Sequence, residues 1–185
     1  MDKKLLIASF LGSLAMYLWV SIAHMALPLG EAGIKQIDNE EPLLAAMKST
    51  LRSPGMYMFP RMEPGGDQAE NEKKMATGPS GILVYFPTRD FQFGKSLAIE
   101  FVTEFVIVAI GMYLLSLTRI ATFAGRLSFF ALFGFGLATA TNVSYWNWYG
   151  FPSTYTLAYS FTGWAGHVFA GLIAAAMKIG GNEAR

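Results

Sequence analysis

Long apolar runs separated by polar turns dominate the pattern of hydrophobic and polar positions along the chain. Four runs cover residues 5–26, 96–117, 121–143 and 156–177. Each is close to the length of about 20 residues that a helix needs to cross about 30 Å of hydrocarbon. Lipid offers no partners to free backbone N–H and C=O groups, so such runs are expected to be helical. The pattern therefore predicts an all-α integral membrane protein with four transmembrane helices.

The first run also has some features of a signal peptide. It follows a basic start, MDKK, and it holds small residues at Ala23 and Ala26. Its apolar core is longer than the roughly 7–15 residues of a signal sequence. This length favours an uncleaved membrane anchor.

A polar segment, residues 28–95, separates the first two runs, and we treat it as an insertion in a single membrane domain of residues 1–185. Within it, residues 40–52 place their apolar side chains on one helical face and begin with an acidic turn. This pattern predicts a short amphipathic helix, with Asp38 or Asn39 as its N-cap.

Two short apolar stretches, 56–60 and 82–87, lie further along this segment. Both end in Phe-Pro, and they fit either a small hairpin or two separate segments that dip into the membrane interface. The hydrophilic residues 63–78 between them are expected to form a mobile, solvated loop.

The charges beside the runs predict the orientation. The basic residues that flank one side of the four runs are Lys3, Lys4, Arg119, Arg126, Lys178 and Arg185. Because cytoplasmic flanks are rich in Lys and Arg, both termini should be cytoplasmic and 28–95 extracytoplasmic, as in a multi-pass protein of a cell inner membrane. The uncharged connection 144–155 is rich in aromatic residues. It fits a belt at the membrane interface or, alternatively, a platform on which a ligand stacks.

Composition excludes several classes of protein. Apolar and aromatic residues make up 53% of the chain, a balance typical of membrane proteins rather than of soluble domains. The absence of cysteine excludes disulfides, thiolate metal sites and a cysteine nucleophile. The sequence lacks a phosphate-binding loop, a dinucleotide fingerprint and a hydrolase elbow. Its thinly spread basic residues give no footprint for nucleic acid.

Four ionisable residues lie within the predicted helices: His24, Glu100, Glu104 and His167. Such residues are costly in a membrane and are functional-site candidates by default. From the rise of about 1.5 Å per helical residue, His24 and Glu100 should lie near the outer surface, where they can meet. Glu104 and His167 should lie near the middle of the membrane, where they are expected to meet.

Three interpretations of this set remain open. The residues can hydrogen-bond between helices and fix the bundle. They can bind zinc, iron or manganese as two imidazoles and two carboxylates. A haem held by both histidines is less favoured, because the two rings differ in depth by about 10 Å. They can also relay protons, although nothing polar continues the path toward the cytoplasm.

The sequence names no reaction, substrate or cofactor. Its small size and close-packing helix faces favour an accessory or assembly subunit of a larger membrane complex, with the lipid bilayer and other membrane subunits as partners. The alternative is a membrane enzyme, or a metal- or haem-binding protein, that uses His24, Glu100, Glu104 and His167.

Overall fold

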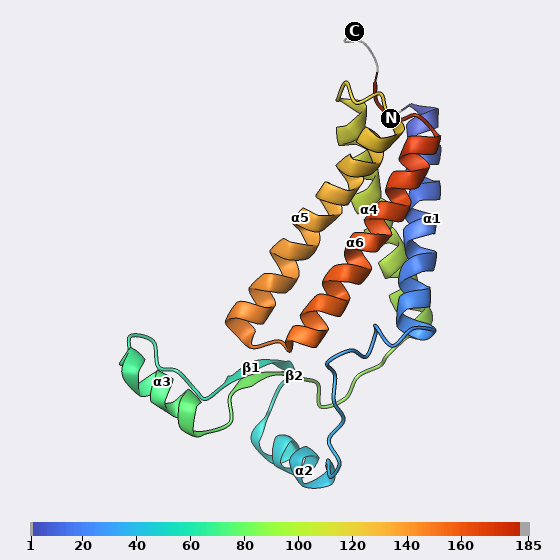
Figure 1. Ribbon diagram of the computed structural model, residues 1–185. Helices are drawn as coiled ribbons and strands as arrows, with labels where there is room; N and C mark the ends of the chain where they lie inside the picture. The colour runs from blue at the N-terminus through green and yellow to red at the C-terminus, as the bar shows by residue number, and fades with distance from the viewer. Residues whose placement is uncertain (1, 182–185) are drawn as a thin grey trace. The chain divides into compact units, whose positions relative to one another are not determined.

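The computed structural model describes residues 2–181 of the chain (Figure 1). The long helices are α1 (Lys3–Met25), α4 (Phe93–Ser116), α5 (Phe123–Tyr149) and α6 (Ser153–Ala176). The short elements are α2 (Glu41–Thr50), β1 (Gly55–Phe59), α3 (Gln68–Thr77) and β2 (Gly81–Tyr85). Contacts divide them into two compact units: a helical unit, which runs up to Ile34 and resumes at Gln92, and an inserted unit, Lys35–Phe91.

Three helices, α1, α4 and α5, are long and apolar enough to cross a membrane. This confirms, at that level, the prediction of a mostly helical chain with helices of membrane-spanning length. The remaining long helix, α6, has 24 residues, as many as α4. It packs against both α1 and α5.

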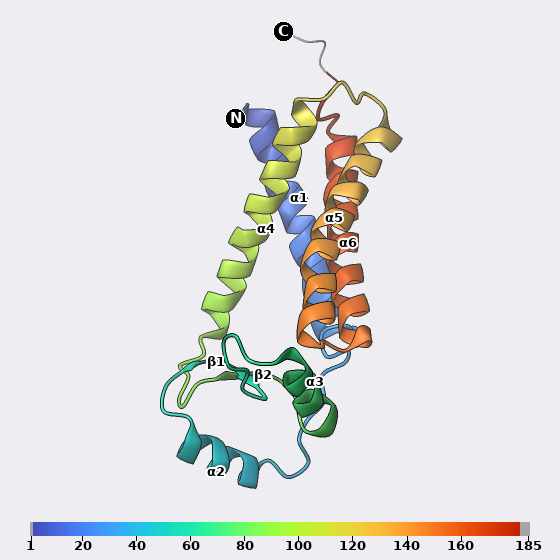
Figure 2. The same cartoon turned by 90° about the vertical axis from the view of Figure 1, so that its left-hand side faces the viewer.

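The long helices form an antiparallel bundle in which neighbours along the row are α4, α1, α6 and α5. We call the end at Lys3 and Ala176 the terminal end, and the end at Met25 and Phe93 the loop end. Helices α4 and α5 touch where Gly111 faces the rings of Phe130 and Phe133. From there they diverge toward the loop end (Figure 1), and α4 also diverges from α1 in that direction (Figure 2).

The turn between α5 and α6 lies further along the chain than the sequence predicts. Helix α5 continues to Tyr149, six residues past the expected end at 143, because no helix-breaking residue interrupts it. Gly150 then takes the left-handed conformation, with φ of 69°, that glycine adopts readily at a helix C-terminus. Pro152 precedes the first residue of α6.

Aromatic rings near this turn pack against one another in a continuous row. The row runs Tyr149, Tyr145, Phe151, Tyr155, Tyr159 and His24, with neighbouring ring centroids 4.1–5.8 Å apart. It joins the loop ends of α5, α6 and α1. Tyr145 and Tyr149 are nevertheless 42% and 41% exposed, so the packed row leaves open both the interfacial belt and the platform for a stacked ligand.

The inserted unit contains the predicted amphipathic helix in shortened form. Helix α2 covers Glu41–Thr50, and its N-cap residue is Glu40, which makes no capping side-chain hydrogen bond. The expected caps Asp38 and Asn39 are therefore wrong. The two short apolar stretches pair as an antiparallel hairpin of β1 and β2, the first of the two arrangements that the sequence allows.

The expectation of a mobile loop over residues 63–78 is wrong for Gln68–Thr77, which forms α3. The Asp67 carboxylate accepts a hydrogen bond from the backbone N–H of Ala69 at 3.0 Å. A salt bridge of 3.0 Å between Lys74 and Glu70 spans one helical turn. No residue of α3 is buried, so local capping and side-chain pairs stabilise this helix.

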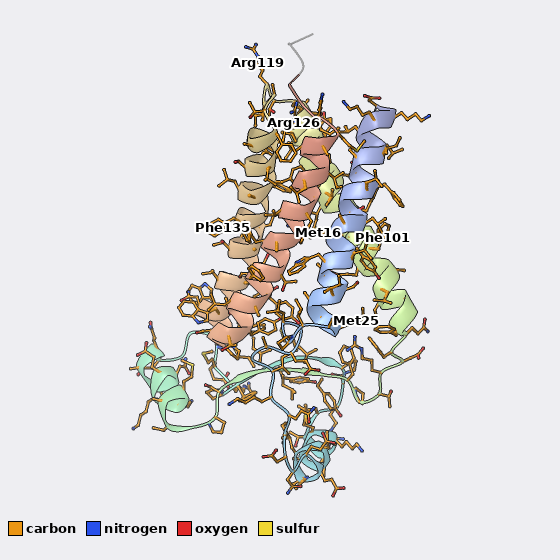
Figure 3. The ribbon with its side chains drawn as sticks, turned by 45° about the vertical axis from the view of Figure 1, so that its right-hand side comes forward. Met16, Met25, Phe101, Arg119, Arg126 and Phe135 are labelled. Carbon is orange, nitrogen blue, oxygen red and sulfur yellow. The ribbon has the colours of Figure 1, made fainter. Side chains whose placement is uncertain are left out.

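Arg126 ties the terminal end of the helical unit together. Its side chain is buried, and its guanidinium donates to the carbonyl oxygens of Ala121, Ile179 and Gly180. The backbone N–H of Gly181 also donates to Thr118 O at 3.2 Å. These bonds hold the residues after α6 against the turn between α4 and α5. Arg119, by contrast, extends away from the bundle (Figure 3).

Replacement of Arg126 by alanine should destabilise the helical unit. Hydrogen bonds from a charged group contribute about 1.5–3 kcal/mol each but are not additive, so we expect a loss of about 3 kcal/mol. Thermal unfolding of the purified protein in detergent measures the change. Arg119→Ala, which removes an exposed arginine from the same end, should change stability by less than about 0.5 kcal/mol. Equal effects of the two substitutions would contradict this role of Arg126.

Candidate functional site

The carboxyl group of Glu104 is enclosed by the helical unit without a hydrogen-bond partner. The residue is only 3% exposed, and neither Oε1 nor Oε2 is hydrogen-bonded. It shares one face of α4 with Val108 and Gly111, and Gly111 meets Phe130 and Phe133 of α5. Glu104 therefore projects from the side of α4 that faces the bundle interior.

The imidazole of His167 is also buried, at 4% exposure, and has one unpartnered nitrogen. Its Nδ1 lies 2.7 Å from the backbone oxygen of Gly163 on the same helix. A carbonyl can only accept, so Nδ1 carries the hydrogen. In the neutral ring this leaves Nε2 as an acceptor, and Nε2 has no partner.

Helix α5 holds the imidazole in place. A Cβ added at Gly134 would lie 2.4 Å from the Cβ of His167, so only glycine allows the two helices to approach this closely. The ring of Phe133 meets the imidazole edge to face, with centroids 5.7 Å apart. The position of His167 is thus fixed by packing as well as by its hydrogen bond to Gly163.

Glu104 and His167 lie at nearly the same level of the bundle. Helices α1, α4 and α6 meet at Gly12, where an added Cβ would lie within 3.0–3.6 Å of Met112, Val108 and Ala170. Glu104 precedes Val108 by four residues, and His167 precedes Ala170 by three. Relative to the level of Gly12, Glu104 is therefore displaced toward the loop end by about 6 Å and His167 by about 4.5 Å. The expectation of a shared depth agrees with this estimate.

The predicted hydrogen bond between the two side chains is nevertheless absent. His167 directs Nδ1 along its own helix and packs against Gly134 and Phe133, whereas both oxygens of Glu104 lack a partner. The sequence predicted the depth of each group but not its direction, because burial against α5 and the Gly163 carbonyl determine how the imidazole turns.

His24 and Glu100 do not join this pair. His24 is exposed near the loop end, where Nδ1 lies 2.9 Å from Val20 O and its ring meets that of Tyr159. Glu100 is exposed on α4, one turn from Glu104. The expected contact between His24 and Glu100 is not formed. Within residues 2–181, no group of three or more His, Asp or Glu side chains is placed to hold a metal ion. The assignment of a metal to these four residues stays a prediction.

The glycines near His167 differ in what they contact. Gly171 does bring helices close, since an added Cβ would lie 2.7 Å from the Cβ of Phe130. Gly163 and Gly136 face open space, with nothing within 4 Å of an added Cβ. Gly163 contributes its carbonyl instead. The spacing of four residues between Gly163 and His167 is a sequence signal that could have predicted the hydrogen bond between the Gly163 carbonyl and the imidazole. No comparable sequence signal predicted the contact of Phe133 with the imidazole.

Within residues 2–181, the carboxylate oxygens of Glu104 and Nε2 of His167 are hydrogen-bond acceptors without a donor. These atoms are buried, and an unpaired buried polar group costs about 1–3 kcal/mol. The imidazole geometry, with Nδ1–H on a carbonyl and Nε2 free, is the one that orients histidine toward a metal or a hydrogen-bond donor. The pair is therefore suited to a small cation or a molecule that donates hydrogen bonds.

Replacement of Gly134 by alanine should force α5 and His167 apart. Overpacking of a close helix contact costs about 1–3 kcal/mol, so we expect a clear fall in thermal stability. Gly136→Ala adds the same methyl group two residues away in open space, where the higher helix propensity of alanine should leave stability unchanged or slightly raised. Unfolding of both variants in detergent tests the contact. A Gly134→Ala protein as stable as Gly136→Ala would show that the contact is not close.

Comparison with known proteins adds no assignment to this geometry. No protein-family model matches the chain, and neither a curated protein nor a solved structure matches it. The site is therefore interpreted from its own residues and contacts.

Proposed function

We propose that the protein is a four-span inner-membrane protein that binds a small cationic or hydrogen-bond-donating ligand inside its bundle. The observation that carries this proposal is the pair of buried acceptors without partners, Glu104 and Nε2 of His167. Ionisable groups inside membrane helices are retained mainly where they serve a ligand or a transfer path. Their shared level along the bundle supports a ligand common to both.

Helix α6 is the fourth span in this proposal. It is as long as α4 and packs along both α1 and α5. An even number of spans places both chain ends on one side, which agrees with the basic residues gathered at the terminal end. The positive-inside rule then makes that side cytoplasmic and the inserted unit extracytoplasmic.

A ligand would reach the pair from the loop end. Glu100 lies one turn from Glu104 toward the loop end and is exposed, so polar surface begins close to the pair on that side. On the other side of the pair the buried core consists of apolar residues, including Phe130, Met112 and Leu115. This arrangement supports a binding site that opens toward one side rather than a path through the membrane.

Native mass spectrometry of protein extracted from its own membranes tests the binding proposal. We expect the wild-type protein to carry an additional bound mass. Glu104→Gln and His167→Gln should lose it, because each alters one of the two acceptors. Glu100→Gln makes the same chemical change at an exposed position of the same helix and should retain it.

Two results would contradict binding at this pair. One is a wild-type mass equal to that of the polypeptide alone, with the variants altered only in thermal stability; the residues would then serve helix packing. The other is equal retention of the bound mass by Glu104→Gln and Glu100→Gln, which would place the ligand elsewhere.

A second function, as an accessory or assembly subunit of a larger membrane complex, is favoured by Glu100. Its carboxylate is exposed on an apolar helix, and contact with lipid is unfavourable for a charged group. A neighbouring membrane subunit that offers a donor would cover it. Gly136 and Thr139, exposed on α5, add a surface on which another helix can approach closely.

Purification in a mild detergent tests this second function. A stoichiometric membrane partner should accompany the wild-type protein and be lost with Glu100→Leu, which removes the polar contact. Ser128→Leu, at an exposed position of α5, controls for added apolar bulk. A wild-type protein that purifies alone, or a partner that survives Glu100→Leu, would argue against a subunit contact at Glu100.

A further inference from the structure

The hairpin of the inserted unit is apolar on both faces. Its register pairs Met56 with Val84 and Met58 with Ile82. Since side chains alternate between the two faces of a strand, these four project from one side. The opposite face carries Tyr57, Phe59, Leu83 and Tyr85. A strand pair that faced water on one side would instead alternate apolar and polar residues.

The two faces differ in how well they are covered. On the first, Met56 is 69% exposed, Val84 63% and Met58 50%, while Ile82 is half-buried. On the second, Phe59 is 41% exposed, but Leu83 is half-buried and Tyr85 is buried. Tyr85 meets the ring of Tyr57, whose hydroxyl donates to Ser53 O at 2.8 Å. We call Met56, Met58, Ile82 and Val84 the open face. It holds no polar side chain that could interact with water.

An isolated two-stranded hairpin is only marginally stable in water, so we expect another surface to bury its exposed apolar face. The connections of the inserted unit along the chain indicate which surface that is. The inserted unit is joined on one side to α1 and on the other to α4, and both helices are long and apolar enough to span a membrane. A bilayer surface is thus always within reach of the hairpin, at a high effective concentration.

The charge of the unit agrees with an apolar contact. Residues 35–91 contain eight acidic and seven basic side chains, a net charge of −1, so electrostatic attraction to anionic lipid is weak. The open face has methionine, isoleucine and valine, which can enter the region below the lipid headgroups. We propose that the open face of the hairpin docks on the lipid bilayer surface and holds the inserted unit against the membrane.

The proposal depends on α1 and α4 crossing the membrane but not on ligand binding at Glu104 and His167. The absence of cysteine allows single labels to be placed without background. Met58→Cys and Val84→Cys, each carrying a bimane fluorophore, are reconstituted as full-length protein in phosphatidylcholine vesicles. Lipids with brominated acyl chains quench a fluorophore that lies in the bilayer, whereas iodide quenches one that lies in water.

Brominated lipid should quench the labels at Met58 and Val84, and iodide should not. A label at Leu83, the neighbour of Val84 on the opposite face, should be quenched less by brominated lipid, and one at Glu72 in α3 should be quenched by iodide. High salt should leave the pattern unchanged, because the contact is apolar. Met56→Cys repeats the measurement on the same face if either strand variant misfolds.

Quenching of the open-face labels by iodide would overturn the proposal, because the face would then lie in water. Protection from both quenchers would also overturn it, because a protein surface would then cover the face. Equal quenching of Val84 and Leu83 by brominated lipid would show insertion without the facial preference that the register requires.

Discussion

The close approach of α5 and α6 at two glycines determines the geometry of the helical unit. At Gly134 the backbone of α5 lies against His167, and at Gly171 the backbone of α6 lies against Phe130. Between membrane helices the hydrophobic effect gives little drive for association, so close van der Waals packing has to supply it. Because a methyl group at either glycine would overlap a neighbour, these contacts fix the spacing of the helices and the direction of the imidazole.

Buried polar groups in the bundle differ in whether the fold satisfies them, and within residues 2–181 Glu104, Thr156 and His167 have buried side-chain atoms without a hydrogen-bond partner. Arg126 is buried and charged, yet its guanidinium donates to three carbonyl oxygens, so its burial is compensated within the fold. Glu104 and His167 are as deeply buried, but their free acceptors have no donor. The hydrogen bonds of Arg126 account for its burial by a structural role. The unpartnered atoms of Glu104 and His167 leave a free-energy cost that a bound hydrogen-bond donor or cation would remove.

The sequence was sufficient to predict the long helices and the common level of Glu104 and His167 along the bundle, because both follow from apolar run length and helical rise. It was insufficient where one contact decides between alternatives. His167 turns toward Gly134 and Gly163 rather than Glu104, which depends on how α5 crosses α6. Helix α3 was missed because its polar composition resembles a loop, although Asp67 and the Glu70–Lys74 pair were visible as local signals.

Helix α4 contacts α5 and α6 only sparsely, and the site lies beside these contacts. Helix α4 packs mainly against α1, and it contacts α5 where Gly111 meets Phe130 and Phe133, seven residues further along α4 than Glu104. From that contact α4 and α5 diverge toward the loop end, whereas His167 is held by Gly134 and Phe133 of α5 (Figure 1). A ligand between the two acceptors would supply a bond between α4 and α6 where the apolar packing supplies little. Binding would then stabilise the loop end of the bundle, which joins the unpartnered acceptors and the divergence of α4 from α5 in one physical explanation.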